Sequence, residues 1–341
     1  MSKTLYFVGI DVSNATFAAS IFRADDKSVI IEESIANNTD GFVSFTVWLK
    51  EHNVTTSNSS ICMEATGVYS EAIAHYLAAE GFKVTVEPPL KVKRAFEPCG
   101  HKTDAVDSKQ IAEYAYRFSD ELKPWQPADE ILEKIRQLLA VREQFVKQKV
   151  AIKNAMHAYS KHIVQVGLIK KAHKETLAQL DKQIKRIENE LSRLIGDNPT
   201  ISQKTDILRS IPGCGMLLAC NLMEITSCFK EISDHKQLAA FIGIVPYKYQ
   251  SGTTVNKRPR IRHFGPPLTR KLLRLASVSV ATHDKQFRAY YLRKVAQGKA
   301  KSLVLNNIAN KLIKLACAMI RDNKRYIKEY SSVNPMYLKI A

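Results

Sequence analysis

Short apolar runs separated by turn residues fill the first part of the chain, up to about residue 119. The first three runs, at residues 4–10, 15–22 and 28–33, are separated by short turns that contain Asn14 and Asp25-Asp26. Runs of this length bounded by turn residues are typical of strands. The pattern therefore predicts three consecutive strands that form a β-meander.

Helical and strand patterns alternate after the meander. We expect a helix at 41–51, a strand at 59–64, a helix at 70–80, a strand at 82–86 and a helix from Asp104. This is the element order of the ribonuclease-H-like fold, an α/β fold with a mixed sheet. Because the same fold carries nucleases, sugar kinases and actin-like ATPases, the order alone does not assign a function.

From Asp129 to about Gly196 the chain is charged and nearly free of glycine and proline. A break near Gly167 separates two segments in which apolar residues recur every three or four positions, a spacing that keeps one apolar seam on a helix. We expect a long antiparallel helical hairpin or a coiled-coil arm over residues 121–200, between an N-terminal domain, 1–120, and a C-terminal domain, 201–341. A plain layer of a helical bundle is the alternative.

The C-terminal domain begins with a glycine-containing turn between two helical patterns, at Pro212-Gly213-Cys214-Gly215. This arrangement predicts a helix-hairpin-helix, in which Gly213 and Gly215 let backbone N–H groups approach a phosphate. The alternative is a glycine-rich turn that is buried between helices for packing alone.

Positive charge is concentrated at the C-terminal end of the chain. The formal net charge is +18, and the residues from Phe241 onward hold 21 Lys and Arg against 3 Asp and Glu, while the preceding residues balance. Apolar periodicity continues through 303–315, which indicates a mostly helical, folded domain with a cationic face rather than a disordered tail. We expect a polyanion as the partner; a ribosome-associated or merely basic protein is the alternative.

Cysteines and apolar runs restrict the remaining classes. Six cysteines include no C-x-x-C pair, so we expect free thiols rather than disulfides or a zinc site. No apolar run reaches the ~18 residues that a membrane span needs. We therefore expect a cytoplasmic, nucleoid-associated protein.

Four carboxylates are candidates for chemistry. Asp11 and Glu64 each end a predicted strand, and Asp104 and Asp107 share one face at the start of a predicted helix. Adjacent strand ends would bring these side chains to one edge of the sheet. Hard oxygen ligands of this kind suit Mg²⁺, and two such ions stabilise the attacking and leaving oxygens of a phosphoryl transfer.

Each carboxylate also has an ordinary explanation. Asp11 fits a turn after a strand, and Asp104 and Asp107 fit the first turn of a helix, where negative charge is favourable. A kinase reading of Gly9-Ile10-Asp11 as a phosphate loop is weaker, because the chain has no second Asp-x-Gly loop and no glycine-rich adenosine site.

A second candidate centre lies at residues 246–265, which we expect to form an exposed loop. Ser251 precedes a glycine, which makes its hydroxyl sterically open, and four cations follow it that would hold a phosphate: Lys257, Arg258, Arg260 and Arg262. Tyr247 and Tyr249 are alternative nucleophiles or stacking partners.

Five short motifs, in order, resemble those of the DEDD transposases of the IS110 group of insertion sequences, a group that includes the Piv/MooV DNA invertases. They are Gly9-Ile10-Asp11-Val12-Ser13, Met63-Glu64-Ala65-Thr66-Gly67-Val68-Tyr69, Lys102-Thr103-Asp104-Ala105-Val106-Asp107-Ser108, Ile211-Pro212-Gly213-Cys214-Gly215 and Gln250-Ser251-Gly252.

The resemblance implies an N-terminal RuvC-like domain whose acidic tetrad, Asp11, Glu64, Asp104 and Asp107, binds Mg²⁺. It also implies a C-terminal transposase domain in which Ser251 becomes covalently joined to DNA during strand exchange. Members of the group act as dimers or tetramers, and many use a noncoding guide RNA, a bridge RNA, that pairs with donor and target DNA. Ser251 lies far along the chain from the tetrad. We expect the serine of one subunit to meet the carboxylates of another; the alternative is that the domains of one chain fold back on each other.

The sequence thus predicts a Mg²⁺-dependent, serine-mediated DNA recombinase that moves an insertion sequence under RNA guidance. Three alternatives stay open: a site-specific DNA invertase that needs no guide RNA, a Holliday-junction-type nuclease that uses the same carboxylates with water, and a non-catalytic architectural nucleic-acid-binding protein.

Overall fold

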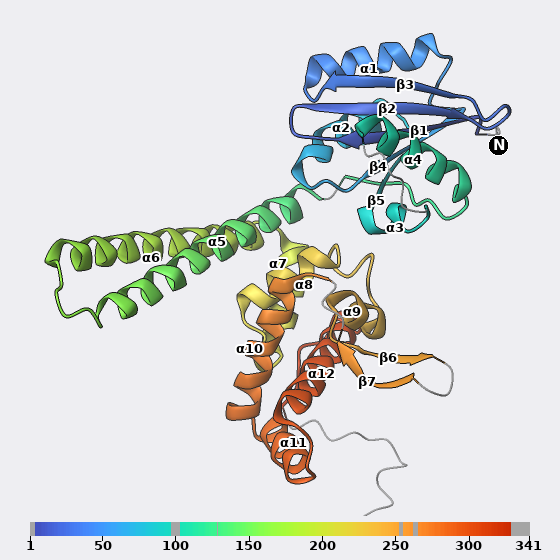
Figure 1. Cartoon of the computed structure of the whole chain (residues 1–341). Helices are drawn as coiled ribbons and strands as arrows, with labels where there is room; N and C mark the ends of the chain where they lie inside the picture. Colours follow the sequence, from blue (N-terminus) through green and yellow to red (C-terminus); the bar gives the residue numbers. More distant parts are fainter. Residues whose placement is uncertain (1–3, 97–102, 128, 252–254, 262–264, 329–341) are drawn as a thin grey trace, which may run out of the picture. The chain divides into compact units, whose positions relative to one another are not determined.

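The chain forms two compact units, residues 1–127 and 128–341, which we call the N-terminal and C-terminal units (Figure 1). The structure is a computed structural model, and it describes residues 4–96, 103–127, 129–251, 255–261 and 265–328.

A five-stranded mixed sheet forms the centre of the N-terminal unit, with the strand order β3-β2-β1-β4-β5. The first three strands pair antiparallel, as predicted for the meander, and β4 and β5 extend the sheet in parallel with β1. The bounds are β1 Tyr6–Val12, β2 Thr16–Arg23, β3 Val29–Ala36, β4 Ser59–Glu64 and β5 Val84–Glu87.

Helices cover both faces of this sheet because successive strand residues point to opposite sides. On one face, Val8 and Ile10 of β1 join a cluster with residues of α1 (Thr39–Glu51) and α2 (Val68–Ala79). On the other face, Phe7 of β1 and Cys62 of β4 pack against α4 (Asp104–Arg117) and the short helix α3 (Pro89–Lys93). The predicted strands and helices of this unit are confirmed. The structure adds the short helix α3, which the sequence analysis did not predict.

The contact between α4 and β1 is very close. A Cβ atom built on Gly9 would lie 2.2 Å from both the backbone nitrogen of Ala112 and the backbone oxygen of Ser108. Beside this point the buried hydroxyls of Ser20 on β2 and Ser108 on α4 hydrogen-bond at 2.8 Å. Only glycine therefore permits α4 to lie at this depth on the sheet.

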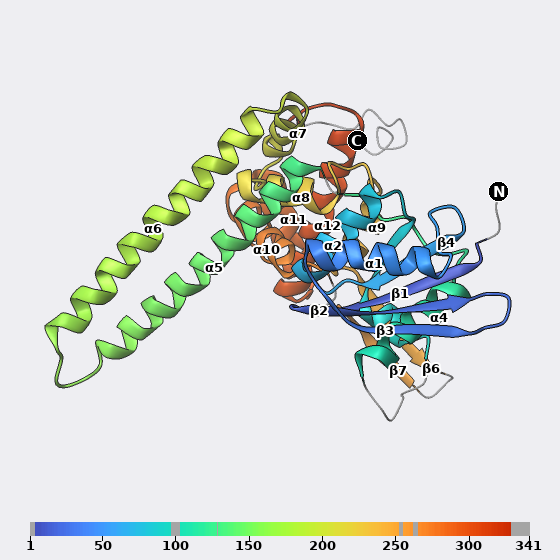
Figure 2. The same ribbon diagram turned by 90° about the horizontal axis from the view of Figure 1, so that it is seen from above.

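Two long helices, α5 (Glu130–Tyr159) and α6 (Gly167–Gly196), run side by side as a hairpin within the C-terminal unit (Figure 2). Two ion pairs join them, Arg142 with Glu188 at 2.7 Å and Lys149 with Asp181. The predicted helical hairpin is confirmed, while its coiled-coil geometry and its separation as a domain of its own stay predictions.

The two ends of the hairpin differ in burial. At the root, Ile135 of α5 and Leu191 of α6 are fully buried in the core of the C-terminal helices. At the tip, Ile163, Val164 and Leu168 are exposed, with 102%, 82% and 73% relative exposure. The hairpin is thus anchored at one end and uncovered at the other.

The remaining elements of the C-terminal unit are mostly helical, as predicted. They are α7 Pro199–Ser210, α8 Met216–Ile225, α9 His235–Ile242, β6 Pro246–Ser251, β7 Val255–Ile261, α10 Pro267–His283, α11 Lys285–Ala296 and α12 Lys301–Arg321. Strands β6 and β7 pair antiparallel, so the expectation of an exposed loop over 246–265 is wrong for these segments. The two tyrosines of β6 and the β-branched Val255 and Ile261 of β7 favour strands, and β6 ends at Ser251, where the turn signal of Ser251-Gly252 begins.

Helix α12 corrects the expectation that no segment is long and apolar enough to span a membrane. Its 21 residues are long and apolar enough to cross a membrane, judged by length and composition only. Its apolar residues Ile308, Leu312 and Ile313 are nevertheless buried in the core of the C-terminal unit. This burial explains the apolar composition of α12, because the face that the helix turns toward the core consists of apolar residues.

Replacing Gly9 by alanine tests how closely α4 is packed. We expect Gly9→Ala to lower the free energy of unfolding of the N-terminal unit by about 1–3 kcal/mol, because the added methyl group must displace the backbone of α4. Thermal and urea unfolding measure the effect. Gly196→Ala is the matched control, since nothing lies within 4 Å of its added Cβ; equal stability of the two variants would contradict the close packing.

Candidate functional site

Two of the four predicted carboxylates lie side by side at the ends of neighbouring parallel strands. In the register of β1 with β4, Ile10 pairs with Met63, so the next residues along each strand are Asp11 and Glu64. Both residues are half-buried. Residues in register on parallel strands point to the same side of a sheet, and here this side is the one that α4 covers.

The other two carboxylates lie in the first turn of α4. The hydroxyl of Thr103 caps this helix by accepting a hydrogen bond from the backbone N–H of Val106 at 3.3 Å. Asp104 and Asp107 follow, where negative charge is favourable at a helix N-terminus. Because α4 crosses β1 at Gly9, two residues before Asp11, its first turn lies near the end of that strand.

A pocket of about 370 Å³ supports this placement of Asp104. Asp104 and Thr103 line the pocket together with Ala18 of β2, which is the register partner of Asp11. The backbone therefore brings all four predicted carboxylates to one edge of the sheet, which we call the carboxylate edge (Asp11, Glu64, Asp104 and Asp107).

The side chains at the carboxylate edge do not form a closed ion-binding group. Within the part of the chain that the structure describes, no three His, Cys, Asp or Glu side chains are grouped so as to hold a metal ion. Asp104 is exposed, and Asp107 is half-buried. The predicted gathering of the four carboxylates thus applies to their backbone positions.

The donor set of the edge nevertheless fits a divalent cation. All four predicted ligands are carboxylates, which are the hard oxygen donors that Mg²⁺ prefers. Two residues beyond Glu64, the hydroxyl oxygen of Thr66 is buried and has no hydrogen-bond partner among the described residues. Buried polar atoms are normally satisfied, so such an atom indicates a place for a bound water, ion or substrate group.

Sequence reasoning missed a fifth carboxylate, Glu87, in the same row. Glu87 ends β5, pairs in register with Glu64, and is only 7% exposed. Its Oε1 atom lies 3.1 Å from Nζ of Lys91 on α3. The sequence held a signal for it, because Glu87 ends the apolar strand Val84–Glu87 just as Glu64 ends its own.

The pKa of the Cys62 thiol is affected by burial and by the carboxylates nearby. Burial raises its pKa to about 12, and the carboxylates of Glu87 and Glu64 contribute to the increase. Both carboxylates therefore act on the face of the sheet that carries Cys62 and α4. The Glu87–Lys91 ion pair places one positive charge beside this acidic row.

Ser251 is the last residue of β6, where it pairs with Val255 at the end of the two-stranded sheet. Its side chain, and those of Lys257 and Arg258 on β7, lie outside what the structure describes, as does Arg262. Arg260 is exposed. The backbone thus places Ser251, Lys257, Arg258 and Arg260 on one β-hairpin, in the unit that does not contain the carboxylate edge.

Two helices, α7 and α8, flank the turn at Pro212–Gly215, as predicted, while the assignment of this arrangement as a nucleic-acid-binding helix-hairpin-helix stays a prediction; its two glycines have different roles. Gly213 has φ +77°, and a Cβ there would lie 2.6 Å from Cγ1 of Val280 on α10, so this position serves packing. Gly215 precedes α8 without a side-chain cap, and nothing lies within 4 Å of its Cβ position. Of these two glycines, only Gly215 leaves room for a ligand.

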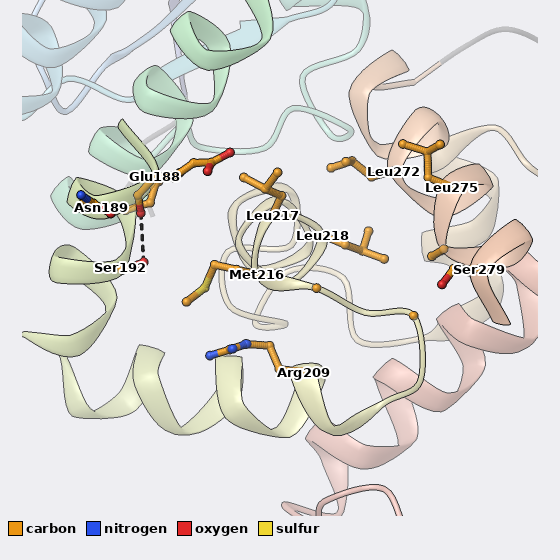
Figure 3. Close-up of a pocket in the computed structure, with 14 residues that line it drawn as sticks. Glu188, Asn189, Ser192, Arg209, Met216, Leu217, Leu218, Leu272, Leu275 and Ser279 are labelled. Atoms are coloured by element: carbon orange, nitrogen blue, oxygen red, sulfur yellow. Dashed lines mark hydrogen bonds between the residues drawn. The ribbon is translucent and has the colours of Figure 1, made fainter. Parts of the chain in front are cut away.

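A pocket of about 600 Å³ lies beside this turn, between α6, α8 and α10 (Figure 3). Arg209 extends from α7 toward it, and Met216, Leu217 and Leu272 make much of its lining apolar. Two kinds of hydrogen-bond donor at this pocket could bind an anion: the first backbone N–H groups of α8 and the guanidinium of Arg209.

Comparison with known proteins gives matches to both units. Residues 8–165 match the family model of the DEDD, IS110-type "Transposase", and residues 205–292 match "Transposase IS116/IS110/IS902 family". Pilin gene-inverting proteins of Moraxella lacunata and Moraxella bovis are each 27% identical over 331 residues, which covers 96% of this chain and 99% of each relative. An uncharacterized protein of the insertion element IS110 from Streptomyces coelicolor is 26% identical over 151 residues, 44% of this chain and 36% of that protein.

The Glu87–Lys91 pair can be tested by a double-mutant cycle. We expect Lys91→Met to lower the free energy of unfolding by about 1–2 kcal/mol, because it leaves the charge of Glu87 buried without its partner. Glu87→Gln/Lys91→Met should recover much of this loss, since the remaining side chain is then neutral. Urea unfolding measures both. Lys93→Met on the same helix is the control, and an equal loss in that variant would show that the ion pair has no specific role.

Proposed function

Because the chain belongs to the IS110 family of transposases and is therefore a DNA recombinase, we propose that it cuts and rejoins DNA with Ser251 as the nucleophile and with Mg²⁺ held at the carboxylate edge. The N-terminal unit would be the RuvC-like domain of this family. The observation that carries the proposal is the strand register, in which Asp11 and Glu64 are neighbours below the first turn of α4.

Each carboxylate has a stated part in the proposed reaction. Asp11 and Glu64 would hold the cations from the strand ends, and Asp104 and Asp107 would complete the ligand set from α4. A bound pair of Mg²⁺ ions supplies positive charge that stabilises the attacking and leaving oxygens of the scissile phosphate. The half-buried positions of Asp11, Glu64 and Asp107 favour this role, since a carboxylate with restricted motion loses less entropy when it binds an ion.

Ser251 would supply the covalent step. Its Oγ atom loses a proton and forms a bond to phosphorus, while the bond between that phosphorus and a deoxyribose oxygen breaks and the oxygen leaves as a hydroxyl. Attack by the hydroxyl of another strand on the same phosphorus releases the serine and joins the strands. The number of phosphodiester bonds is conserved, so the exchange needs no nucleotide cofactor.

Nucleic acid would be bound mainly by the C-terminal unit. Lys257, Arg258, Arg260 and Arg262 flank Ser251 in sequence and are proposed to hold phosphates near its hydroxyl. Gly215 would let the turn before α8 approach the phosphates of a nucleic acid, since nothing lies within 4 Å of its Cβ position, while Gly213 would support the turn through its packing against α10. The protein is proposed to act as a dimer or tetramer in the nucleoid, with the hairpin of residues 121–200 as an arm between the catalytic and transposase domains.

A guide RNA is proposed as the source of sequence specificity, with DNA as donor and target. A second candidate function, site-specific inversion of DNA without a guide RNA, is favoured by one observation. The pilin gene-inverting proteins are similar to this chain along 96% of its length, whereas the insertion-element proteins are similar along 44%.

Replacing Ser251 and Asp11 separates the two parts of the mechanism. We expect Ser251→Ala to bind a labelled duplex that carries the element junction, and to form no covalent protein–DNA adduct, because alanine has no nucleophilic oxygen. Asp11→Ala should also bind without forming the adduct. Denaturing gels measure the adduct in the presence of Mg²⁺ and in the presence of EDTA.

Ser302→Ala is the control for these variants, since Ser302 is an exposed serine of the same unit. A normal yield of adduct from Ser251→Ala would exclude this serine as the nucleophile. Mg²⁺-dependent cleavage without any adduct, in the unaltered protein, would support the Holliday-junction-type nuclease instead. Binding without cleavage under every condition would support an architectural role.

Removal of RNA distinguishes guided transposition from unguided inversion. We expect recombination of a plasmid that carries the element, measured by amplification across the new junctions, to fall at least tenfold after the purified protein is treated with RNase A. Addition of RNA transcribed from the DNA next to the coding region should restore it. Full activity after RNase treatment would favour the invertase.

A further inference from the structure

A group of cations lies where α11 packs against α12, and we call it the α11–α12 patch (Arg293, Lys294, Lys311 and Lys314). Two of these cations contact the ring of Tyr290, whose centroid is 3.8 Å from Nζ of Lys311 and 5.9 Å from Cζ of Arg293. A lysine ammonium at this distance from an aromatic ring forms a cation–π interaction. The ring therefore holds Lys311 in a defined position.

None of the four cations forms an ion pair with a carboxylate of the described residues. The acidic residues nearest in sequence have other partners: Asp284 caps α11 by accepting a hydrogen bond from the backbone N–H of Phe287 at 3.0 Å, and Asp322 pairs with Arg321 at 2.8 Å. Lys294 donates a hydrogen bond to the neutral side chain of Gln297 at 3.0 Å. The positive charge of the patch is thus not neutralised by this part of the chain.

The surroundings of Lys311 disfavour its charged form. The pKa of its ammonium is lowered, first by burial against its surroundings and then by the positive charges of Arg293, Lys294 and Lys314. Both causes disfavour the charged form of the lysine. A bound anion would reverse the effect of the neighbouring charges, because it would be attracted by all four cations at once.

The ordinary role of basic residues at the end of a helix explains part of the patch. Arg293 and Lys294 lie in the last turn of α11, where positive charge is favourable. Lys311 and Lys314 lie well inside α12, three residues apart on its exposed face, so this explanation does not extend to them. The opposite face of α12 is buried through Ile308 and Leu312, which fixes the helix that carries both lysines.

We propose that the α11–α12 patch is a binding site for the phosphates of a nucleic-acid backbone. This inference rests on the proposed function, and it adds a site that includes neither the β6–β7 hairpin nor the turn before α8. Lys311 and Lys314 also lie beyond both segments that match transposase family models, residues 8–165 and 205–292. Contacts of lysine and arginine with phosphates position a nucleic acid without reading its sequence.

Neutralising Lys311 tests the patch directly. The probes are a DNA duplex of about 30 base pairs with unrelated sequence and an RNA hairpin of equal charge, and binding to the full chain is measured by fluorescence anisotropy across a series of KCl concentrations. We expect Lys311→Met to weaken binding about 5- to 10-fold near 100 mM salt and to reduce the slope of log affinity against log salt by about 1, because one phosphate contact is lost.

Lys134→Met is the matched control. It removes the same charge from the same unit, and Lys134 already has a carboxylate partner, Glu130, at 2.6 Å. We expect this control to keep the salt slope of the unaltered protein. A loss with DNA alone would assign the patch to the donor or target, and a loss with RNA alone would assign it to the guide; either result supports a phosphate site.

Substitutions of Tyr290 test whether its ring supports binding by holding Lys311, an effect on affinity that a residue needed only for folding would not show. Tyr290→Phe keeps the ring that supports Lys311 and should bind as the unaltered protein does, whereas Tyr290→Leu should weaken binding about 2- to 3-fold, as expected from the loss of a cation–π contact. Lys311→Arg should retain the affinity. Melting temperatures within a degree of one another show that each variant is folded.

An unchanged affinity and salt slope in Lys311→Met, with both probes, would overturn the inference. This outcome is distinguishable from failure of the proposed function, which is judged by the Ser251 adduct. If the unaltered protein forms the adduct and Lys311→Met binds normally, only the patch is refuted. If no adduct forms while Lys311→Met loses affinity, the serine mechanism fails and the patch stands.

Discussion

The close contact between α4 and β1 at Gly9 is the constraint on which the carboxylate edge depends. Because the backbone of α4 rests directly on that of β1, the first turn of the helix lies near the strand ends that carry Asp11 and Glu64. A side chain at this point would lift the helix and move Asp104 and Asp107 away. The chemistry proposed for this edge thus depends on a position that has no side chain at all.

The two units carry opposite kinds of charge. In the N-terminal unit, Asp11, Glu64 and Glu87 lie at the ends of three adjacent strands, and Glu87 has a lysine, Lys91, as its ion-pair partner. In the C-terminal unit, the excess of Lys and Arg lies on a folded helical core. An acidic row attracts cations and repels DNA, so a recombinase needs cationic surfaces elsewhere to hold its substrate against that repulsion.

Hydrophobic periodicity was sufficient to predict most of the helices and strands. It failed for features that depend on short elements or on tertiary contacts. The strand that ends at Glu64 and the helix that begins at Asp104 have the predicted bounds, since apolar alternation and the Thr103 cap are local signals. The Glu87–Lys91 pair joins the end of β5 to the short helix α3, whose five residues are too few for hydrophobic periodicity to reveal. The apolar face of α12 resembles a membrane span in composition, and only its packing shows that it is a core helix.

The hairpin of α5 and α6 has a mechanical consequence. Thirty residues at a rise of about 1.5 Å each make every helix about 45 Å long, and the ion pairs Arg142–Glu188 and Lys149–Asp181 stiffen the pair between root and tip. A small rotation at the buried root is therefore amplified into a displacement of many ångströms at the uncovered tip. A partner that binds Ile163 and Leu168 at the tip could therefore turn the root of the hairpin with a small force, because it would act about 45 Å from it.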